Sequence, residues 1–199
     1  MHLPLPNSKW NTLVQLLTLI GTLLQKQRDA MGMLEINEMG SHFFESKATS
    51  VWIKQMLNHL SKKDGETKKN ANIAFEIEEL MAKIPRRSQI ILFIDLFQEN
   101  LEKILDAAAL LAFEGHSVRC TFISHAELEL NEEYFAGKQV IDIETGTKAY
   151  MNQNDAKRYV SFVEAQKEWA ITLSRNLNLN CKILDASREP MYLLRELLA

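Results

Sequence analysis

Apolar and polar positions follow each other along the chain with two different periods, one typical of strands and one typical of helices. Residues 90–94 form an uninterrupted apolar run, as expected of a strand in a parallel sheet that helices cover on both faces. Residues 101–112 repeat apolar side chains at helical spacing and end before Gly115, and residues 118–123 are strand-like again. This order of strand, helix and strand predicts a right-handed parallel crossover. It indicates an α/β fold with a doubly wound, mostly parallel sheet flanked by helices.

The same two periods predict the remaining elements. Ser8 can cap a buried helix that runs to about residue 27, and Asn100 can cap the helix over 101–112. A small hairpin over 140–143 and 148–150 is inserted into the regular alternation. The other expected elements are strands at 29–36, 43–44 and 181–184, and helices at 49–60, at 73–84 after a cap at Asn70 or Asn72, at 155–178 after a cap at Asn154 or Asp155, and from Pro190 onward.

Composition and charge narrow the class of protein. A chain of 199 residues with 46% hydrophobic and 25% charged residues is typical of one globular domain over 1–199. The formal net charge of -3 and the scattered lysines and arginines argue against nucleic-acid binding. The apolar stretch at 13–24 is interrupted by polar residues and is shorter than the roughly 20 apolar residues of a membrane span. Cys120 and Cys181 lie in strand-like stretches, so we expect reduced, buried thiols in adjacent strands of a cytoplasmic protein.

Asp95 is the leading candidate for a functional residue, because it follows the central apolar run at the carboxyl end of its strand. Ligands of open α/β sheets bind at that edge; the alternative is an exposed Asp that opens a loop. The sequence has no glycine-rich dinucleotide turn, phosphate loop or Gly-x-Ser-x-Gly elbow, and Phe97 stands where an aspartyl phosphatase has its second carboxylate. The histidines show no spacing typical of metal ligands, and the acidic residues from Glu127 to Glu133 are expected on a solvated face.

Several short pieces of sequence, taken in order, carry a resemblance to a known family. They are Asp29-Ala-Met-Gly-Met-Leu-Glu, Ile91-Leu-Phe-Ile-Asp-Leu, Glu114-Gly-His-Ser-Val, Ala126-Glu-Leu-Glu-Leu and Asp142-Ile-Glu-Thr-Gly. Together they resemble the bacterial von Willebrand factor A-like proteins of unknown function that are found with MoxR-type AAA ATPases. The resemblance covers nearly the whole chain. It implies a Rossmann-like, von Willebrand factor A-like domain that binds protein partners, a MoxR-type AAA ATPase among them, rather than turning over a substrate.

The resemblance also implies a metal-ion-dependent adhesion site. In the family this site draws on an Asp-x-Ser-x-Ser motif after the first strand, a Thr from a later loop and an Asp after the fourth strand. Asp95 matches the last and Thr67 the second, although Lys68 and Lys69 depart from the usual neighbours. The Asp-x-Ser-x-Ser motif is absent and would stand just before Met1, which implies an N-terminally incomplete domain. We therefore expect Mg²⁺ to bind weakly or not at all, since most of its oxygen ligands are missing.

Two classes of function remain open. The leading hypothesis is a non-enzymatic interaction domain, an adaptor or partner of a MoxR-type AAA ATPase with a degenerate metal site. The alternative is a small α/β hydrolase or phosphotransfer enzyme that uses Asp95, although the sequence offers Asp95 few titratable companions. The family's first strand would lie between the strands near 31–36 and 90–95. Without it we expect these two strands to close up and pair directly, with self-association to weak homodimers as the second choice.

Overall fold

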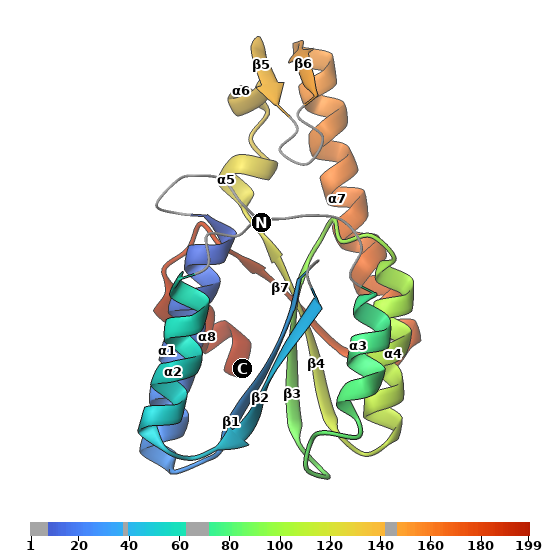
Figure 1. Ribbon diagram of the computed structural model, residues 1–199. Coiled ribbons are helices and arrows are strands. Elements are labelled where there is room, and N and C mark those ends of the chain that lie inside the picture. The colour runs from blue at the N-terminus through green and yellow to red at the C-terminus, as the bar shows by residue number, and fades with distance from the viewer. Residues whose placement is uncertain (1–7, 38–39, 63–71, 142–146) are drawn as a thin grey trace.

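The computed structural model describes residues 8–37, 40–62, 72–141 and 147–199. Its central sheet has three parallel strands in the order β3 (Gln89–Asp95), β4 (Ser117–Ser124) and β7 (Asn180–Asp185). Helix α4 (Leu101–Phe113) connects β3 to β4, and helix α7 (Gln153–Asn176) precedes β7. The three strands end at one edge, the carboxyl edge, which is the upper edge of the sheet in Figure 1.

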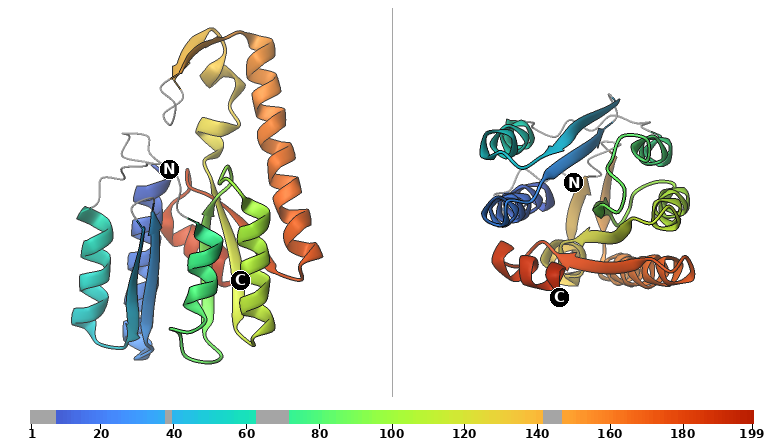
Figure 2. Two further views of the ribbon diagram at one scale, coloured as in Figure 1. Left: turned by 45° about the vertical axis from the view of Figure 1, so that its right-hand side comes forward. Right: turned by 90° about the horizontal axis from the view of Figure 1, so that it is seen from below.

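Helices cover both faces of the central sheet. Figure 2 shows α1 (Lys9–Gln27), α2 (Ser50–Lys62) and α8 (Pro190–Leu198) on one side, and α3 (Ile73–Leu80), α4 and α7 on the other. Side chains of β4 alternate accordingly. Phe122 belongs to the core that includes Leu105 and Leu111 of α4, whereas Ile123 belongs to the core that includes Leu16 of α1 and Leu193 of α8. The predicted α/β fold, with parallel strands between two layers of helices, is confirmed.

A separate antiparallel sheet of β1 (Met31–Asn37) and β2 (Gly40–Lys47) lies beside the central one. It has a core of its own, in which Met31 and Phe44 pack with Ile53 and Met56 of α2. In Figure 1, β1 runs in the same direction as β3, and within the described part of the chain no ladder joins the two strands. The expectation that these strands close up and pair directly is therefore wrong.

Helix α1 provides the physical reason why the two strands stay apart. Leu16 packs in the core with Ile123 and Leu184 of the central sheet, whereas Leu17 and Leu24 pack against the β1–β2 core. Because one helix is fixed to both sheets, β1 cannot approach β3 without the loss of one set of contacts. The space between them, lined by residues 31–36 and 89–95, is referred to below as the slot.

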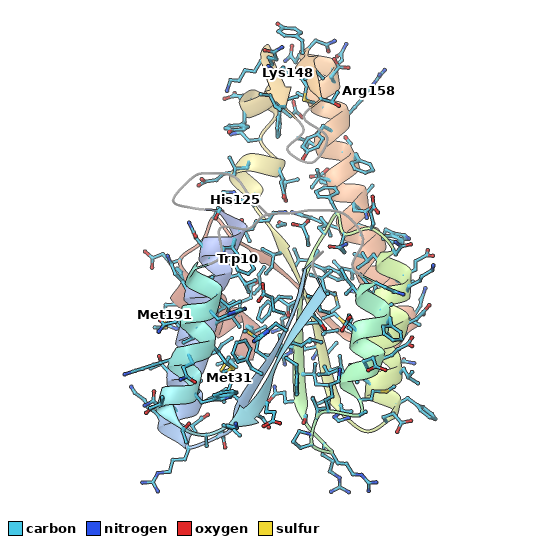
Figure 3. The ribbon with its side chains drawn as sticks, in the orientation of Figure 1. Trp10, Met31, His125, Lys148, Arg158 and Met191 are labelled. Carbon is cyan, nitrogen blue, oxygen red and sulfur yellow. The ribbon has the colours of Figure 1, made fainter. Side chains whose placement is uncertain are left out.

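A small arm projects beyond the carboxyl edge, and Lys148 and Arg158 lie near its far end (Figure 3). Its ring contacts include Phe135 and Tyr159, whose centroids are 4.8 Å apart. The predicted hairpin is present, with residues 142–146 outside the described ranges. The arm also contains two short helices that were not predicted, because they are too brief to show a helical period in the sequence. The arm consists of α5 (Ala126–Glu129), α6 (Glu132–Phe135), the antiparallel strands β5 (Lys138–Ile141) and β6 (Lys148–Met151), and the first half of α7.

The helix caps follow the predicted residues with two exceptions. Ser8 and Asn72 accept hydrogen bonds from backbone N–H groups in the first turns of α1 and α3. Asn100 stands at the start of α4, but its backbone is left-handed, with φ of 56°, and its side chain makes no capping hydrogen bond. The cap of α7 is Asn152, and Asp155 accepts a hydrogen bond from the Asn152 N–H to complete a capping box. The helix therefore begins earlier than predicted.

The two cysteines lie side by side, as predicted. Cys120 of β4 and Cys181 of β7 are direct partners in the parallel ladder, and both thiols are free. Cys120 is buried, whereas Cys181 is only partly buried because β7 is the last strand of the sheet. The prediction of full burial is thus correct for Cys120 alone. None of the described helices is long and apolar enough to cross a membrane.

Candidate functional site

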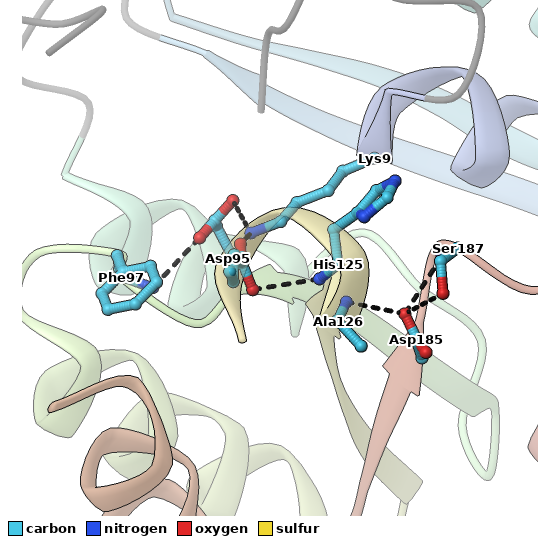
Figure 4. Close-up of polar contacts among 8 residues, drawn as sticks. Lys9, Asp95, Phe97, His125, Ala126, Asp185 and Ser187 are labelled. Atoms are coloured by element: carbon cyan, nitrogen blue, oxygen red, sulfur yellow. Dashed lines mark hydrogen bonds and ion pairs between the residues drawn. The ribbon is translucent and has the colours of Figure 1, made fainter. Parts of the chain in front are cut away.

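Asp95 lies at the carboxyl end of β3, as predicted, and its carboxylate is held from two sides (Figure 4). Its Oδ1 accepts a hydrogen bond of 3.0 Å from the N–H of Phe97. Its Oδ2 lies 3.4 Å from Nζ of Lys9. The side chain is 19% exposed, so Asp95 is mostly buried and its charge is compensated within the protein.

Lys9 joins Asp95 to a second carboxylate. Lys9 directly follows the cap of α1, so the start of that helix brings its side chain to the carboxyl edge. Its ammonium contacts Oε1 of Glu129 as well as Asp95, and Oε2 of Glu129 accepts a hydrogen bond of 3.0 Å from the N–H of His125. The Lys9 and Glu129 side chains are only 12% and 10% exposed. Charged groups this deeply buried are found almost only in pairs.

Asp185 is a third carboxylate at the same edge. Its Oδ1 accepts hydrogen bonds from the N–H of Ala126 at 2.9 Å and from the N–H and hydroxyl of Ser187 at 3.1 Å and 2.8 Å. Burial by itself would raise the pKa of Asp185, but these hydrogen bonds outweigh it and hold the pKa below its ordinary value. Asp185 thereby ties the end of β7 to the start of α5. Lys9, Asp95, Glu129 and Asp185 are referred to below as the carboxyl-edge cluster.

Helix α7 contributes two further titratable groups near this cluster. Burial, followed by the negative charges of Glu129 and Asp95, raises the pKa of Tyr159 to about 12. Burial lowers the pKa of Lys167, although the charges of Glu129 and Asp185 act in the opposite direction. Tyr159 therefore stays protonated at neutral pH.

An aromatic pair lies beside the cluster at the surface. The rings of Phe97 and Phe162 stack with 5.9 Å between their centroids. They are 37% and 56% exposed, and Nζ of Lys9 lies 5.9 Å from the centre of the Phe97 ring. The carboxyl edge thus combines a compensated charge cluster with exposed apolar rings.

The cluster in this form does not fit a divalent cation. The ammonium of Lys9 is paired with both Asp95 and Glu129, and an oxygen of Asp185 already accepts three hydrogen bonds. Among the residues that the structure describes, no group of three or more His, Cys, Asp or Glu side chains could hold a metal ion. Thr67 lies outside the described ranges. The weak or absent Mg²⁺ binding expected at Asp95 and Thr67 stays a prediction.

Sequence reasoning found Asp95 but missed its companions. Asp185 follows the apolar residues 183–184 at the end of its strand just as Asp95 follows its own run, so the same argument could have identified it. Glu129 was expected on a solvated face, but it is only 8% exposed, because Lys9 and the N–H of His125 engage its two oxygens. No sequence signal identifies Lys9, since its role depends on how α1 docks on the sheet.

A large cleft extends from the cluster into the slot. Its volume is about 2440 Å³, and it is lined by both facing strands along their length. Lys9 and Glu129 line it at the carboxyl edge, and Arg86 and Arg87 line it at the opposite edge. Lys9, Asp95 and Glu129 of the carboxyl-edge cluster therefore lie on one continuous surface with the slot.

A family model matches residues 5–170, which is more than half of the chain. The chain belongs to the DUF58 family. DUF58 is described as a family of proteins of unknown function. The DUF58 chain is also similar to a solved structure, the crystal structure of conserved hypothetical protein BatB from Bacteroides thetaiotaomicron, with a TM-score of 0.50 and 12% sequence identity over 92% of this chain and 84% of that chain. No curated protein matches the sequence.

At 12% identity, the likeness of the DUF58 chain to BatB shows the fold alone. That fold is mixed α/β, with three parallel strands between helices, and is consistent with a Rossmann-like, von Willebrand factor A-like domain. The DUF58 assignment agrees with the coarser part of the resemblance, an uncharacterised family with this fold. The association with MoxR-type ATPases and the missing Asp-x-Ser-x-Ser motif stay predictions.

Proposed function

We propose that this DUF58 chain is a non-enzymatic protein-interaction domain that binds a partner at its carboxyl edge. The observation that carries the proposal is the pairing of Lys9 with both Asp95 and Glu129. A general acid, base or nucleophile needs a group that can reach the substrate. Here Lys9 and the N–H of Phe97 engage both oxygens of the Asp95 carboxylate. The cluster instead fixes α1 and α5 to the end of the sheet.

The surface around the cluster supports a role in protein binding. Phe97 and Phe162 form an exposed aromatic pair there. Aromatic side chains are enriched at protein interfaces and often contribute most of the binding energy. The hydrogen bond from the Phe97 N–H to Asp95 of the cluster would hold this pair in place before a partner arrives, and a preorganised surface loses less entropy on binding.

The partner that we propose is a MoxR-type AAA ATPase, for which the chain would act as an adaptor. Support for this partner comes from the sequence resemblance to von Willebrand factor A-like proteins found with such ATPases, and membership of DUF58 agrees with that resemblance in family and fold. Weak homodimers remain part of the same proposal, since the exposed rings of Phe97 and Phe162 also offer apolar surface to a second copy.

The test is a titration of the purified chain with a purified MoxR-type AAA ATPase from the same organism, followed by calorimetry. We expect saturable binding to the wild type and at least roughly tenfold weaker binding to Phe162→Ser, which removes an exposed ring from the pair. Phe113→Ser is the matched control, because Phe113 is 85% exposed at the end of α4 remote from the carboxyl edge. Equal weakening by both variants, or no binding at all, would overturn the proposed site or partner.

A parallel activity screen addresses the enzymatic alternative. Nucleoside triphosphates and an aryl phosphate are offered to the wild type and to Asp95→Asn, which keeps the shape of the side chain and removes its charge. We expect no turnover that depends on Asp95. Hydrolysis by the wild type that Asp95→Asn abolishes would show a catalytic carboxylate, and the interaction-only proposal would then be wrong.

A further inference from the structure

Cys120 and Cys181 form a pair of thiols apart from the carboxyl-edge cluster. They are direct partners in the parallel ladder of β4 and β7, so their side chains leave the sheet on the same face. This is the face that α4 and α7 cover (Figure 2). Cys120 belongs to the core there that includes Val163 and Ala170 of α7, and Cys181 packs against the same core. The two sulfurs are therefore neighbours between the sheet and α7.

The spacing of the two strands is wider than a disulfide bond needs. Neighbouring strands lie about 4.8 Å apart, and side chains that leave them side by side keep roughly this spacing at their Cβ atoms. In a disulfide the Cβ atoms are about 3.8 Å apart and the sulfurs about 2.05 Å. Two metal–sulfur bonds of about 2.3 Å each, placed in line, span about 4.6 Å. The ladder thus suits one ion between the sulfurs of Cys120 and Cys181 better than a direct bond.

The surroundings of the pair restrict which metal ion it can bind. Thiolate ligands select Cu(I), Zn²⁺ and iron–sulfur clusters. Structural Zn²⁺ and iron–sulfur clusters need four ligands. Among the described residues, no third His, Cys, Asp or Glu side chain joins the two thiols in a group that could hold a metal ion. Cu(I), a closed-shell ion that two thiolates in line can satisfy, is the member of this set that fits the pair.

Positive charge beside the pair favours a singly charged ion. When Cu(I) replaces both thiol protons, one Cu⁺ and two R–SH groups give a bis-thiolate complex with one negative charge and two H⁺. Burial raises the pKa of Cys181, whereas a hydrogen bond with the Ser174 side chain and the positive charge of Arg175 act in the opposite direction. The guanidinium of Arg175, near the end of α7, is therefore close enough to compensate the charge of the complex.

The ion has a route to the pair from the side of Cys181. Cys120 is 0% exposed, but Cys181 is only partly buried, because β7 is the last strand of the sheet. Its thiol takes the ion first, and the Cys120 thiol then completes the coordination. Apolar surroundings afterwards keep water and other ligands away from the ion.

We propose that Cys120 and Cys181 form a two-coordinate binding site for Cu(I), with Arg175 as the compensating charge. The site lies between β4, β7 and α7. It shares no residue with the carboxyl-edge cluster, and it does not rest on the function proposed for that edge.

Anaerobic titration of the full chain with Cu(I), supplied as its complex with a coloured chelator, tests the proposal. We expect the native wild type to remove one Cu(I) per chain. Cys120→Ser and Cys181→Ser each leave one thiol, so each should bind Cu(I) at least roughly a hundredfold more weakly. Zn²⁺ should not compete. Two Cu(I) per wild-type chain and one per single variant would mean that the thiols act independently, and would overturn the proposal.

Arg175→Gln tests the site with both thiols in place, so the result does not depend on whether the serine variants fold. Its affinity for Cu(I) should fall about twofold to fivefold, as expected for loss of one exposed compensating charge. Arg158→Gln is the matched control, because Arg158 is an exposed arginine of the same helix near the far end of the arm (Figure 3). It should bind Cu(I) as the wild type does. Equal affinities of the two arginine variants would contradict the placement of the site.

X-ray absorption at the copper edge distinguishes this site from other modes of binding. We expect two sulfur neighbours and no bound nitrogen or oxygen. Histidine nitrogen at bonding distance would place the ion elsewhere. Uptake only after unfolding in urea would show that the packed sheet holds no site, and loss of two hydrogens from the protein mass without bound copper would show a disulfide. Each of these three results overturns the proposal.

Discussion

At the scale of single residues, Lys9 is the group on which the carboxyl edge depends. Its ammonium is paired with two carboxylates, and all three side chains are less than one-fifth exposed. The value of such a pair lies less in its attraction than in the cost of leaving its members alone, since removal of one partner of a buried pair costs about 3–5 kcal/mol. Because Asp95 is partly exposed, we expect the cost of removing Lys9 to lie toward the lower end of that range.

Replacement of Lys9 by Met tests this reading of the cluster. We expect Lys9→Met to lower the free energy of unfolding at pH 7 by about 3 kcal/mol, because Asp95 and Glu129 lose their shared counter-charge.

Urea unfolding at pH 7 measures the effect of Lys9→Met. The matched control is Lys54→Met on α2, where the lysine is exposed. Its free energy of unfolding should differ from that of the wild type by no more than about 0.5 kcal/mol. A Lys9→Met protein as stable as this control would mean that the charge pairing of Lys9 does not stabilise the fold.

Asp185 gives the stability of the fold a dependence on acid. Its pKa is held below its ordinary value by hydrogen bonds from Ala126 and Ser187, which outweigh the effect of burial. A depressed pKa in the folded state contributes stability that is present above the unfolded pKa of about 3.9 and is lost as pH falls. Asp185→Asn should lower the free energy of unfolding at pH 7 by about 1–3 kcal/mol. Below pH 4 its unfolding free energy should fall less steeply with decreasing pH than that of the wild type.

Urea unfolding between pH 3 and pH 7 checks this prediction. Asp106→Asn serves as the control, because Asp106 is exposed on α4. We expect its unfolding curve to follow the wild type across the whole pH range. If the unfolding free energy of Asp185→Asn fell with decreasing pH as steeply as that of the wild type, Asp185 would not be the source of the acid dependence.

At the scale of elements, most of the fold could be predicted from the periods of apolar residues. The uninterrupted run of β3 and the helical spacing after it fixed the parallel crossover, and Pro190 marked the start of α8. Contacts set by docking could not be predicted. Asn100 matched the preference for a cap residue, but the turn that follows Asp95 brings it into a left-handed conformation in which its side chain does not cap.

The pairing of β4 with β7 brings the two thiols together. Burial, followed by the charge of Cys181, raises the pKa of Cys120 to about 12, and burial raises that of Cys181. We expect slow reaction of native Cys120 with an aromatic disulfide reagent at pH 8, faster reaction of the partly buried Cys181, and fast reaction of both after unfolding. Cys120→Ser and Cys181→Ser assign the two rates. Fast reaction of both native thiols would contradict the packing of this sheet.

The same pairing affects stability in alkali. Because burial raises the folded pKa of Cys120 from its ordinary value of 9.0 to about 12, its contribution to stability is fully present below pH 9 and is lost as pH rises toward 12. Cys120→Ser should remove this part of the loss of unfolding free energy between pH 9 and about pH 12, as measured by urea unfolding.

At the scale of the whole molecule, the sequence predicted that β1 and β3 would face each other but not that they would stay unpaired. Direct closure was expected because unpaired backbone groups are costly. The structure keeps β1 and β3 apart, because Leu16 of α1 packs with the central sheet while Leu17 and Leu24 pack with β1 and β2. A helix that belongs to two cores cannot be recognised from its own sequence pattern, which shows one wide apolar face for both.

The measurement that tests this account most directly is residue-resolved hydrogen exchange of the free, dilute protein. An open slot predicts an alternating pattern along β3, in which the amides that pair with β4 exchange slowly and those that face the slot exchange roughly a hundredfold faster or more. The same alternation should appear along β1, with slow amides toward β2. Uniform slow exchange along both strands would show that the slot is closed, and would contradict the account.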